Sequence, residues 1–188
     1  MEQLMRTLSI FGLIVMMSAC TGPKGDTTAE KKAFIDNMAS ETLADLYREE
    51  PEAKSRMAKM AGYAVFSNIN TNLFLFSSGS GYGVAHSGGK KTYMKMYSLG
   101  LGPRLGLKDF RAVFMFRDQD TLNKFIEEGW EFGGHADAAA KSDEKGGAVG
   151  GQASVDSDIV IYTLTEAGVA LQATVAGTKY WKNDELNQ

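Results

Sequence analysis

The spacing of apolar residues changes at Tyr63, and this change limits the possible fold more than any other feature of the sequence. Before Tyr63, apolar residues recur at helical intervals from Phe34 to Tyr47, until Pro51 interrupts them. After it, short runs follow the two-residue period of β-strands for most of the remaining chain. We expect strands over residues 63–67, 73–77, 82–86, 110–116, 159–164 and 169–178. Helices followed by a series of strands predict an α+β domain with a mainly antiparallel sheet.

Three helices are expected, and each carries recognisable end signals. Thr27 and Glu30 have the spacing of a capping box at the start of the first helix. Pro51 is suited to open a second, shorter helix because proline is tolerated in the first helical turn. A third helix interrupts the strands, and either Asp118 or Asp120 is expected to cap its N-terminus. Its buried face is expected to contain Leu122, Phe125 and Ile126.

Most of the 21 glycines lie in or between the expected strands. Glycine weakens a strand, so its repeated use indicates bulges, sharp curvature or close backbone packing. Ser87-Gly88-Gly89 is typical of a hairpin turn, after which one strand should place Tyr93, Lys95 and Tyr97 on one face. The expected architecture is therefore N-terminal helices packed on a strongly curved, mainly antiparallel, glycine-rich sheet or partial barrel, with one inserted helix.

Cys20, the only cysteine, follows a basic residue, an apolar run and two small residues, which is the layout of a secretory signal peptide. The segment Ser18-Ala19-Cys20 resembles a bacterial lipobox, which implies that Cys20 is the lipidated first residue of the mature protein. A permanent transmembrane helix is disfavoured, because the run from Leu8 to Met17 is shorter than the roughly 20 residues that cross a bilayer. By analogy with lipoprotein sorting, Thr21 favours the periplasmic face of the outer membrane if the cell is Gram-negative.

Composition limits the class of protein and its partners. Removing residues 1–19 takes away one acid and one base, so the net charge stays at −3. This mild acidity argues against nucleic-acid binding, which normally needs a basic surplus. We expect a signal peptide over 1–19, a lipidated N-terminus and tether over 20–32, one domain over 33–183 and a short tail over 184–188.

Several glycine-rich and aromatic motifs together resemble the SYLF domain family, and the resemblance covers about residues 33–183. The motifs are Ala61-Gly62-Tyr63-Ala64-Val65-Phe66, Gly81-Tyr82-Gly83-Val84, Leu99-Gly100-Leu101-Gly102, Asp109-Phe110, Gly133-Gly134 and Tyr162-Thr163. The resemblance implies a phospholipid-binding module. In some eukaryotic members phosphoinositides are the ligand and actin a partner, and neither is expected for an exported bacterial lipoprotein.

The candidate headgroup-binding residues are basic and lie in the middle of the chain: Lys90, Lys91, Lys95, Arg104, Lys108 and Arg111. On a shared face they would attract anionic headgroups. The alternative is that they are solvated positions on exposed strands, where lysine also hinders edge pairing. Aromatic residues pose the same choice between a membrane interface and the core: Tyr93, Tyr97, Trp130, Tyr180 and Trp181. For Trp130 we favour the core.

Catalytic signatures are few. The sequence has two histidines, no HExxH, no second cysteine and no Gly-x-Ser-x-Gly. His135 and Asp137 would share a strand face if extended, but two ligands do not complete a metal site. We therefore expect no enzymatic activity, cofactor or metal, and a membrane-anchored protein that binds or organises anionic phospholipid in the cell envelope. The alternatives are an envelope scaffold or stress protein with a protein partner, and a hydrolase using His135 and Asp137.

Overall fold

The computed structural model describes residues 22–73, 76–101, 110–132, 153–156, 158–165, 168–169 and 178–188. Its helices are α2 (Thr28–Glu49), α3 (Pro51–Met57), α4 (Gln119–Glu127) and the short 3-10 helix η2 (Asp184–Asn187). Its strands are β1 (Gly62–Leu73), β2 (Phe76–Ser87), β3 (Lys90–Leu101), β4 (Phe110–Phe116), β5 (Trp130–Phe132), β6 (Ala153–Asp156), β7 (Ile159–Thr165), β8 (Gly168–Val169) and β9 (Thr178–Lys182).

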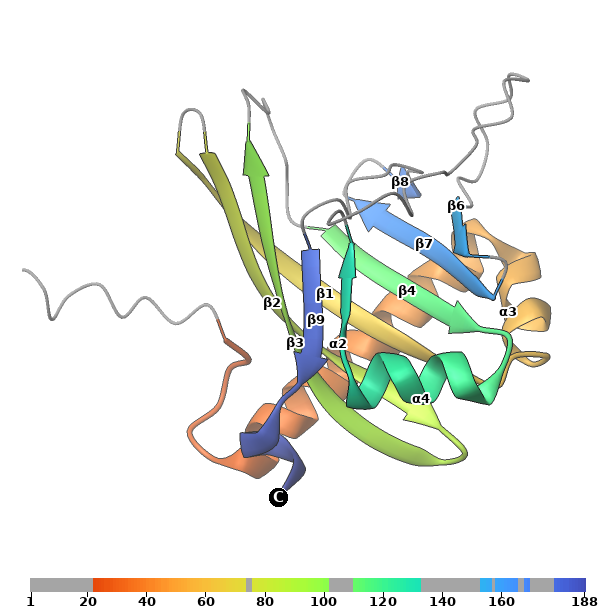
Figure 1. Cartoon of the computed structure of the whole chain (residues 1–188), viewed down its shortest axis with the longest axis horizontal. Coiled ribbons are helices and arrows are strands. Elements are labelled where there is room, and N and C mark those ends of the chain that lie inside the picture. Colours follow the sequence, from red (N-terminus) through yellow and green to blue (C-terminus); the bar gives the residue numbers. More distant parts are fainter. Residues whose placement is uncertain are drawn as a thin grey trace, which may run out of the picture.

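The strands form one antiparallel sheet in the order β5-β9-β3-β2-β1-β4-β7-β6, with β8 paired to β7. Within the described residues the sheet is not closed, because β5 and β6 end the series. Figure 1 shows that the long strands β1, β2 and β3 are strongly bent, with α2 and α4 on opposite sides of the sheet. The predicted α+β class, with helices on a curved antiparallel sheet, is therefore confirmed.

The residues predicted to begin the three helices do so in the structure. Thr27 and Glu30 form a reciprocal capping box at the start of α2, and Pro51 opens α3. The side chain of Asp118 accepts a hydrogen bond from the backbone N–H of Thr121 at 2.8 Å, which caps α4. The folded part is wider than the expected range 33–183, because α2 begins at Thr28 and the buried Leu186 packs at the other end of the chain.

Each face of the sheet carries its own core, because alternate residues of a strand point to opposite sides. Ala64 and Phe66 of β1 face α4, and they belong to a cluster that includes Leu122, Phe125 and Ile126. Val65, between them, faces the other way. It joins a second cluster built with α2 and α3, which includes Ile35, Met38, Leu46, Val113, Met115 and Val160. Burial on both faces explains why β4 is apolar along almost its whole length.

Two expected strands were wrong. Residues 73–77 are not one strand, because β1 ends at Leu73 and β2 begins at Phe76, with these two residues paired across a hairpin. A single strand over 169–178 is excluded because Val169 pairs with β7 while Thr178 begins β9, which pairs with β3 and β5. In both regions of the sequence, β-prone residues continue from one strand into the next. The two-residue spacing of apolar side chains therefore does not mark where one strand ends and the next begins. The turn at Gly88 and Gly89 is confirmed, with φ of 56° and 83°.

Of the three explanations for the glycines, close packing is visible in β2. A Cβ atom at Gly83 would overlap the ring of Phe66 and the carbonyl oxygen of Val65, and one at Gly81 would lie 2.7 Å from Cγ of Met96. Phe66 is fully buried and contacts other rings of the α4-side cluster. The glycine at position 83 therefore lets a large ring pack directly on the strand.

We expect Gly83→Ala to destabilise the domain by about 1–3 kcal/mol, because the added methyl group must displace the Phe66 ring or the neighbouring backbone. Chemical denaturation monitored by circular dichroism would measure the change. Ala85→Gly, two residues along the same strand, is a useful comparison because it removes a buried methyl group without overpacking. A Gly83→Ala protein as stable as the parent would contradict the packing role of this glycine.

Candidate functional site

Of the predicted headgroup-binding residues that the structure describes, two already pair with acids of α2. Lys91 pairs with Asp36 of α2 at 2.8 Å, and Arg111 lies 3.7 Å from both Glu41 and Asp45 of the same helix. The acidic helix thus neutralises two of these bases locally. Such exposed pairs stabilise a protein by about 0–1 kcal/mol.

The remaining predicted bases divide between the two faces of the sheet. Lys90 and Lys95 are exposed and form no ion pair with any described residue. They point to opposite sides of β3, because their positions differ by five, an odd number. Arg104 and Lys108 lie outside the described residues, as do His135 and Asp137. Within the described residues, no group of three or more potential metal ligands occurs.

The structure brings Lys95 next to residues from the far end of the chain. In the β3–β9 register Lys95 is opposite Trp181, and Tyr97 is opposite Lys179. Directly opposed residues share a face, with Cβ atoms about 4.5–5.5 Å apart. These four side chains therefore form one surface of two lysines and two aromatic rings, which we call the β3–β9 patch.

The β3–β9 patch lies just beyond the edge of α2. Tyr82 of β2, in register with Lys95, is buried and packs against Phe34 of α2 at 5.6 Å between ring centroids. Tyr93 is likewise covered, since Lys32 lies over its ring at 5.5 Å. Farther along the strand, the side chain of Tyr97 is 41% exposed, and among the described residues it is the one large hydrophobic side chain that is exposed. Helix α2 therefore covers the positions next to the patch and leaves the patch itself uncovered.

Two acids near the patch are already paired with other residues, and a third, Glu131, directly opposes Lys179. Lys95 and Lys179 are exposed and form no ion pair within the described part of the chain. Asp36 is occupied by Lys91 and by the hydroxyl of Tyr93, and Glu185 by Lys31. Lys179 has one acidic residue, Glu131, as its register partner in β5.

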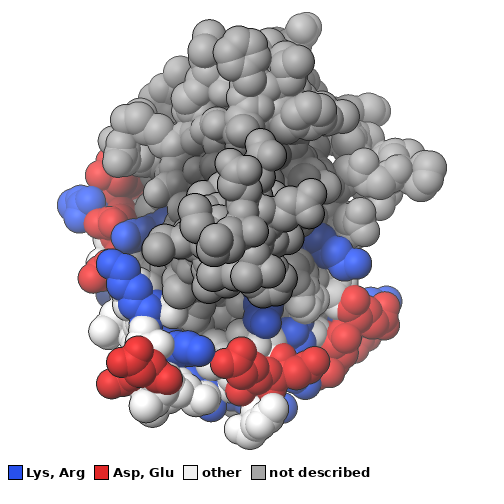
Figure 2. Space-filling model, turned by 90° about the vertical axis from the view of Figure 1, so that its left-hand side faces the viewer, with Lys and Arg blue, Asp and Glu red and all other residues white. Residues whose placement is uncertain are grey.

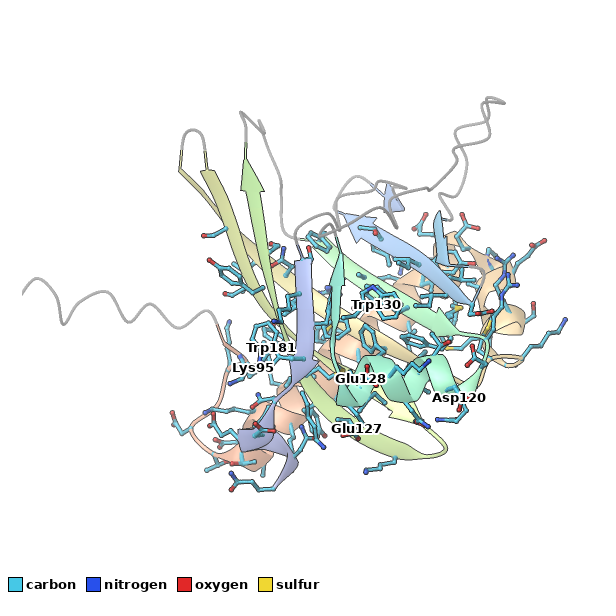
Figure 3. The ribbon with its side chains drawn as sticks, viewed as in Figure 1. Lys95, Asp120, Glu127, Glu128, Trp130 and Trp181 are labelled. Carbon is cyan, nitrogen blue, oxygen red and sulfur yellow. The ribbon has the colours of Figure 1, made fainter. Side chains whose placement is uncertain are left out.

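The two tryptophans occupy opposite sides of the sheet. Trp130 is in register with the fully buried Tyr180 and packs against the α4-side cluster, as predicted. Trp181, one residue after Tyr180, points the other way and is partly buried. Figure 3 shows Trp181 beside Lys95 at the left of β9, whereas Trp130 lies to the right. The sequence predicts that both rings lie at an interface or in the core, but it gives no local signal for the pairing of Trp181 with Lys95, which lies 86 positions earlier in the chain.

A separate cavity of about 410 Å³ lies between α3 and the β2–β3 turn. Its size falls within the range of about 300–1,000 Å³ that is usual for small-molecule sites. Two tyrosines, two methionines, a histidine and a lysine supply its larger side chains: Tyr47, Tyr63, Met57, Met60, His86 and Lys54. Among the described residues, the lining contains no carboxylate and no serine, threonine or cysteine side chain, and its hydroxyl groups are those of Tyr47 and Tyr63.

Burial raises the pKa values of Tyr47 and Tyr63 in this cavity, whereas the pKa of His86 is lowered. The ring of His86 stacks on that of Tyr63 at 4.6 Å and 10°. Burial lowers the pKa of His86, and nearby Lys91 lowers it further while Asp36 acts in the opposite direction. The folded protein therefore favours the neutral imidazole, which suits a ring packed against a second aromatic ring.

We expect stability to fall as the pH is lowered from about 7 to 5, because unfolded His86, with its ordinary pKa near 6.5, binds a proton more readily than the folded residue. His86→Phe keeps a stacked ring and should flatten this part of the profile. Unfolding in urea across this pH range measures the effect. The lowered pKa values of Glu30 and Asp118 act below this window, since their ordinary values are 4.5 and 3.8. An unchanged slope in the variant would contradict the assignment to His86.

No helix in the described part of the chain has both the length and the apolar character needed to cross a membrane. No family model matches the chain. Among characterised proteins, Beta cell expansion factor A of Aeromonas veronii is 32% identical to the chain over 169 residues. The match covers 86% of the chain but 61% of the factor. The chain is thus similar over most of its length to Beta cell expansion factor A, and spans less than two thirds of that protein.

Proposed function

We propose that this chain is a non-enzymatic, lipid-anchored protein of the bacterial cell envelope whose SYLF-type domain binds anionic phospholipid. The observation that carries this proposal is the β3–β9 patch, where two lysines that form no ion pair with the described side chains alternate with two aromatic rings on a part of the sheet that α2 leaves uncovered. Lysine attracts anionic headgroups, and tyrosine and tryptophan favour the boundary between water and hydrocarbon.

The strength expected from the patch is modest. Each lysine near an anionic membrane surface contributes on the order of 1 kcal/mol, so the pair contributes about 2 kcal/mol before the rings are counted. Lys91 and Arg111 add little to this, because they already face acids of α2. The domain is therefore proposed to bind membranes reversibly, while acylated Cys20 provides the lasting attachment.

The location and the family assignment rest on sequence evidence. The lipobox-like segment before Cys20 supports export and acylation, and Thr21 supports the periplasmic face of the outer membrane in a Gram-negative cell. The SYLF type is supported by the ordered glycine and aromatic motifs. Beta cell expansion factor A, to which the chain is similar, is named for an effect on beta cells. Since the chain spans only part of that relative, we propose here the activity that its own described residues support.

We expect a form beginning at residue 21 to float with vesicles that contain phosphatidylglycerol and to remain free with pure phosphatidylcholine. Lys95→Gln together with Lys179→Gln should weaken this binding by roughly 30-fold, because about 2 kcal/mol of attraction is removed. Vesicle flotation at fixed ionic strength measures the bound fraction.

A control of equal net charge is Lys90→Gln with Lys124→Gln, because both lysines are exposed and lie outside the patch. This control should bind nearly as well as the parent. No binding of the parent to any anionic vesicle would overturn the proposal. If one envelope protein dominated crosslinking in cells while the patch variant behaved like the parent, the alternative scaffold function would be favoured.

A further inference from the structure

We propose that the β3–β9 patch docks on the same bilayer that holds Cys20, and so orients the domain, instead of bridging to a second membrane. This inference rests on the proposed function, and it adds which surface of the domain faces which membrane. Its occupant is the headgroup and interfacial layer of an anionic bilayer. Three observations carry it: the short chain between the anchor and the fold, the position of the start of α2, and the distribution of charge.

The anchor leaves little chain between the membrane and the domain. Gly22, the first described residue, is two residues from Cys20, so their Cα atoms are at most about 7 Å apart. The bilayer surface must therefore lie close to Gly22 when Cys20 is acylated. Only the side of the domain near Gly22 can face that surface without a long linker.

The start of α2 is the side that also carries the patch. Lys32, about one helical turn after Thr28, lies over the ring of Tyr93, and Lys31 pairs with Glu185 of η2, directly after β9. Lys95 follows Tyr93 by two residues on the same face of β3. In Figure 3 the described chain begins at the left of the molecule, where Lys95 and Trp181 are labelled. A membrane at the anchor is thus adjacent to the patch.

The distribution of charge favours the same orientation. On the other side of the sheet, Asp120 and Glu127 of α4 and Glu128 directly after it are exposed, and Figure 3 shows them away from Lys95 and Trp181. Glu127 pairs with Lys182 at 3.6 Å, so Asp120 and Glu128 carry the free negative charge there. Figure 2 views the molecule from the left-hand side of Figure 1, and on the described surface Asp and Glu lie along the left edge, the lower rim and the lower right, with Lys and Arg between them. An anionic surface would attract the patch and repel the outer face of α4. The short tether adds a high effective concentration, so weak contacts suffice for docking.

The two tryptophans provide the test in the full lipidated protein, reconstituted in vesicles of phosphatidylcholine and phosphatidylglycerol with brominated acyl chains. Bromine quenches tryptophan fluorescence only near the hydrocarbon. We expect quenching in the parent and in Trp130→Phe, and loss of at least half of it in Trp181→Phe, where only the core-packed Trp130 remains. Lys95→Gln with Lys179→Gln should reduce the quenching, and Lys90→Gln with Lys124→Gln should not.

Quenching that survives unchanged in Trp181→Phe, or that is absent in the parent, would overturn the inference. A second population of anionic vesicles should not cluster with the protein-bearing ones, and clustering that depends on Lys95 and Lys179 would show bridging instead. Failure of the proposed function is distinguishable. In that case the form beginning at residue 21 binds no anionic vesicle, whatever Trp181 reports in the tethered protein. If Trp130→Phe fails to fold, comparison of the parent with Trp181→Phe still decides the outcome.

Discussion

The packing of Tyr180 against the aromatic core determines which way β9 faces. Its fully buried ring lies 4.7 Å from that of Phe66, 5.1 Å from that of Phe114 and 5.8 Å from that of Phe125. Aromatic pairs of this kind contribute roughly 0.5–1.5 kcal/mol each beyond the area they bury. Since Tyr180 must face α4, its neighbours Lys179 and Trp181 must face the other side. The β3–β9 patch is therefore a consequence of how the core is built.

Local signals in the sequence were sufficient to predict the caps and the turn, but not the limits of the strands. The capping box at Thr27, the cap at Asp118 and the turn at Gly88-Gly89 involve residues within four positions of one another, so local patterns predict them correctly. The limits of the strands around Leu73 and Val169 were wrong, because a hairpin and a change of partner strand interrupt apolar runs without changing their composition. Local periodicity shows that a segment is extended, and pairing across the sheet decides where it ends.

The candidate site illustrates the same limit more strongly. A run of bases that is contiguous in sequence is divided by strand alternation, and two of its members, Lys91 and Arg111, meet acids of α2 that lie far away in the chain. Of the predicted set, Lys95 lies on the β3–β9 patch, where the lysines form no ion pair with the described side chains, and the three other patch residues, Tyr97, Lys179 and Trp181, were not in that set. That surface depends on the pairing of β3 with β9, which no short motif encodes. Charge counted along a sequence is therefore a weak guide to charge on a sheet.

The acidity of α2 then has a physical role in the proposed membrane contact. If α2 left Lys91 and Arg111 unpaired, attraction to an anionic surface would be spread across the sheet, and many orientations would be similar in energy. Pairing these bases with Asp36, Glu41 and Asp45 removes that competition and leaves the uncovered β3–β9 patch as the more attractive part of this face. An acylated cysteine beside the start of α2 would hold that patch near the bilayer. Weak attraction confined to one patch would then set an orientation that stronger but dispersed charge would not.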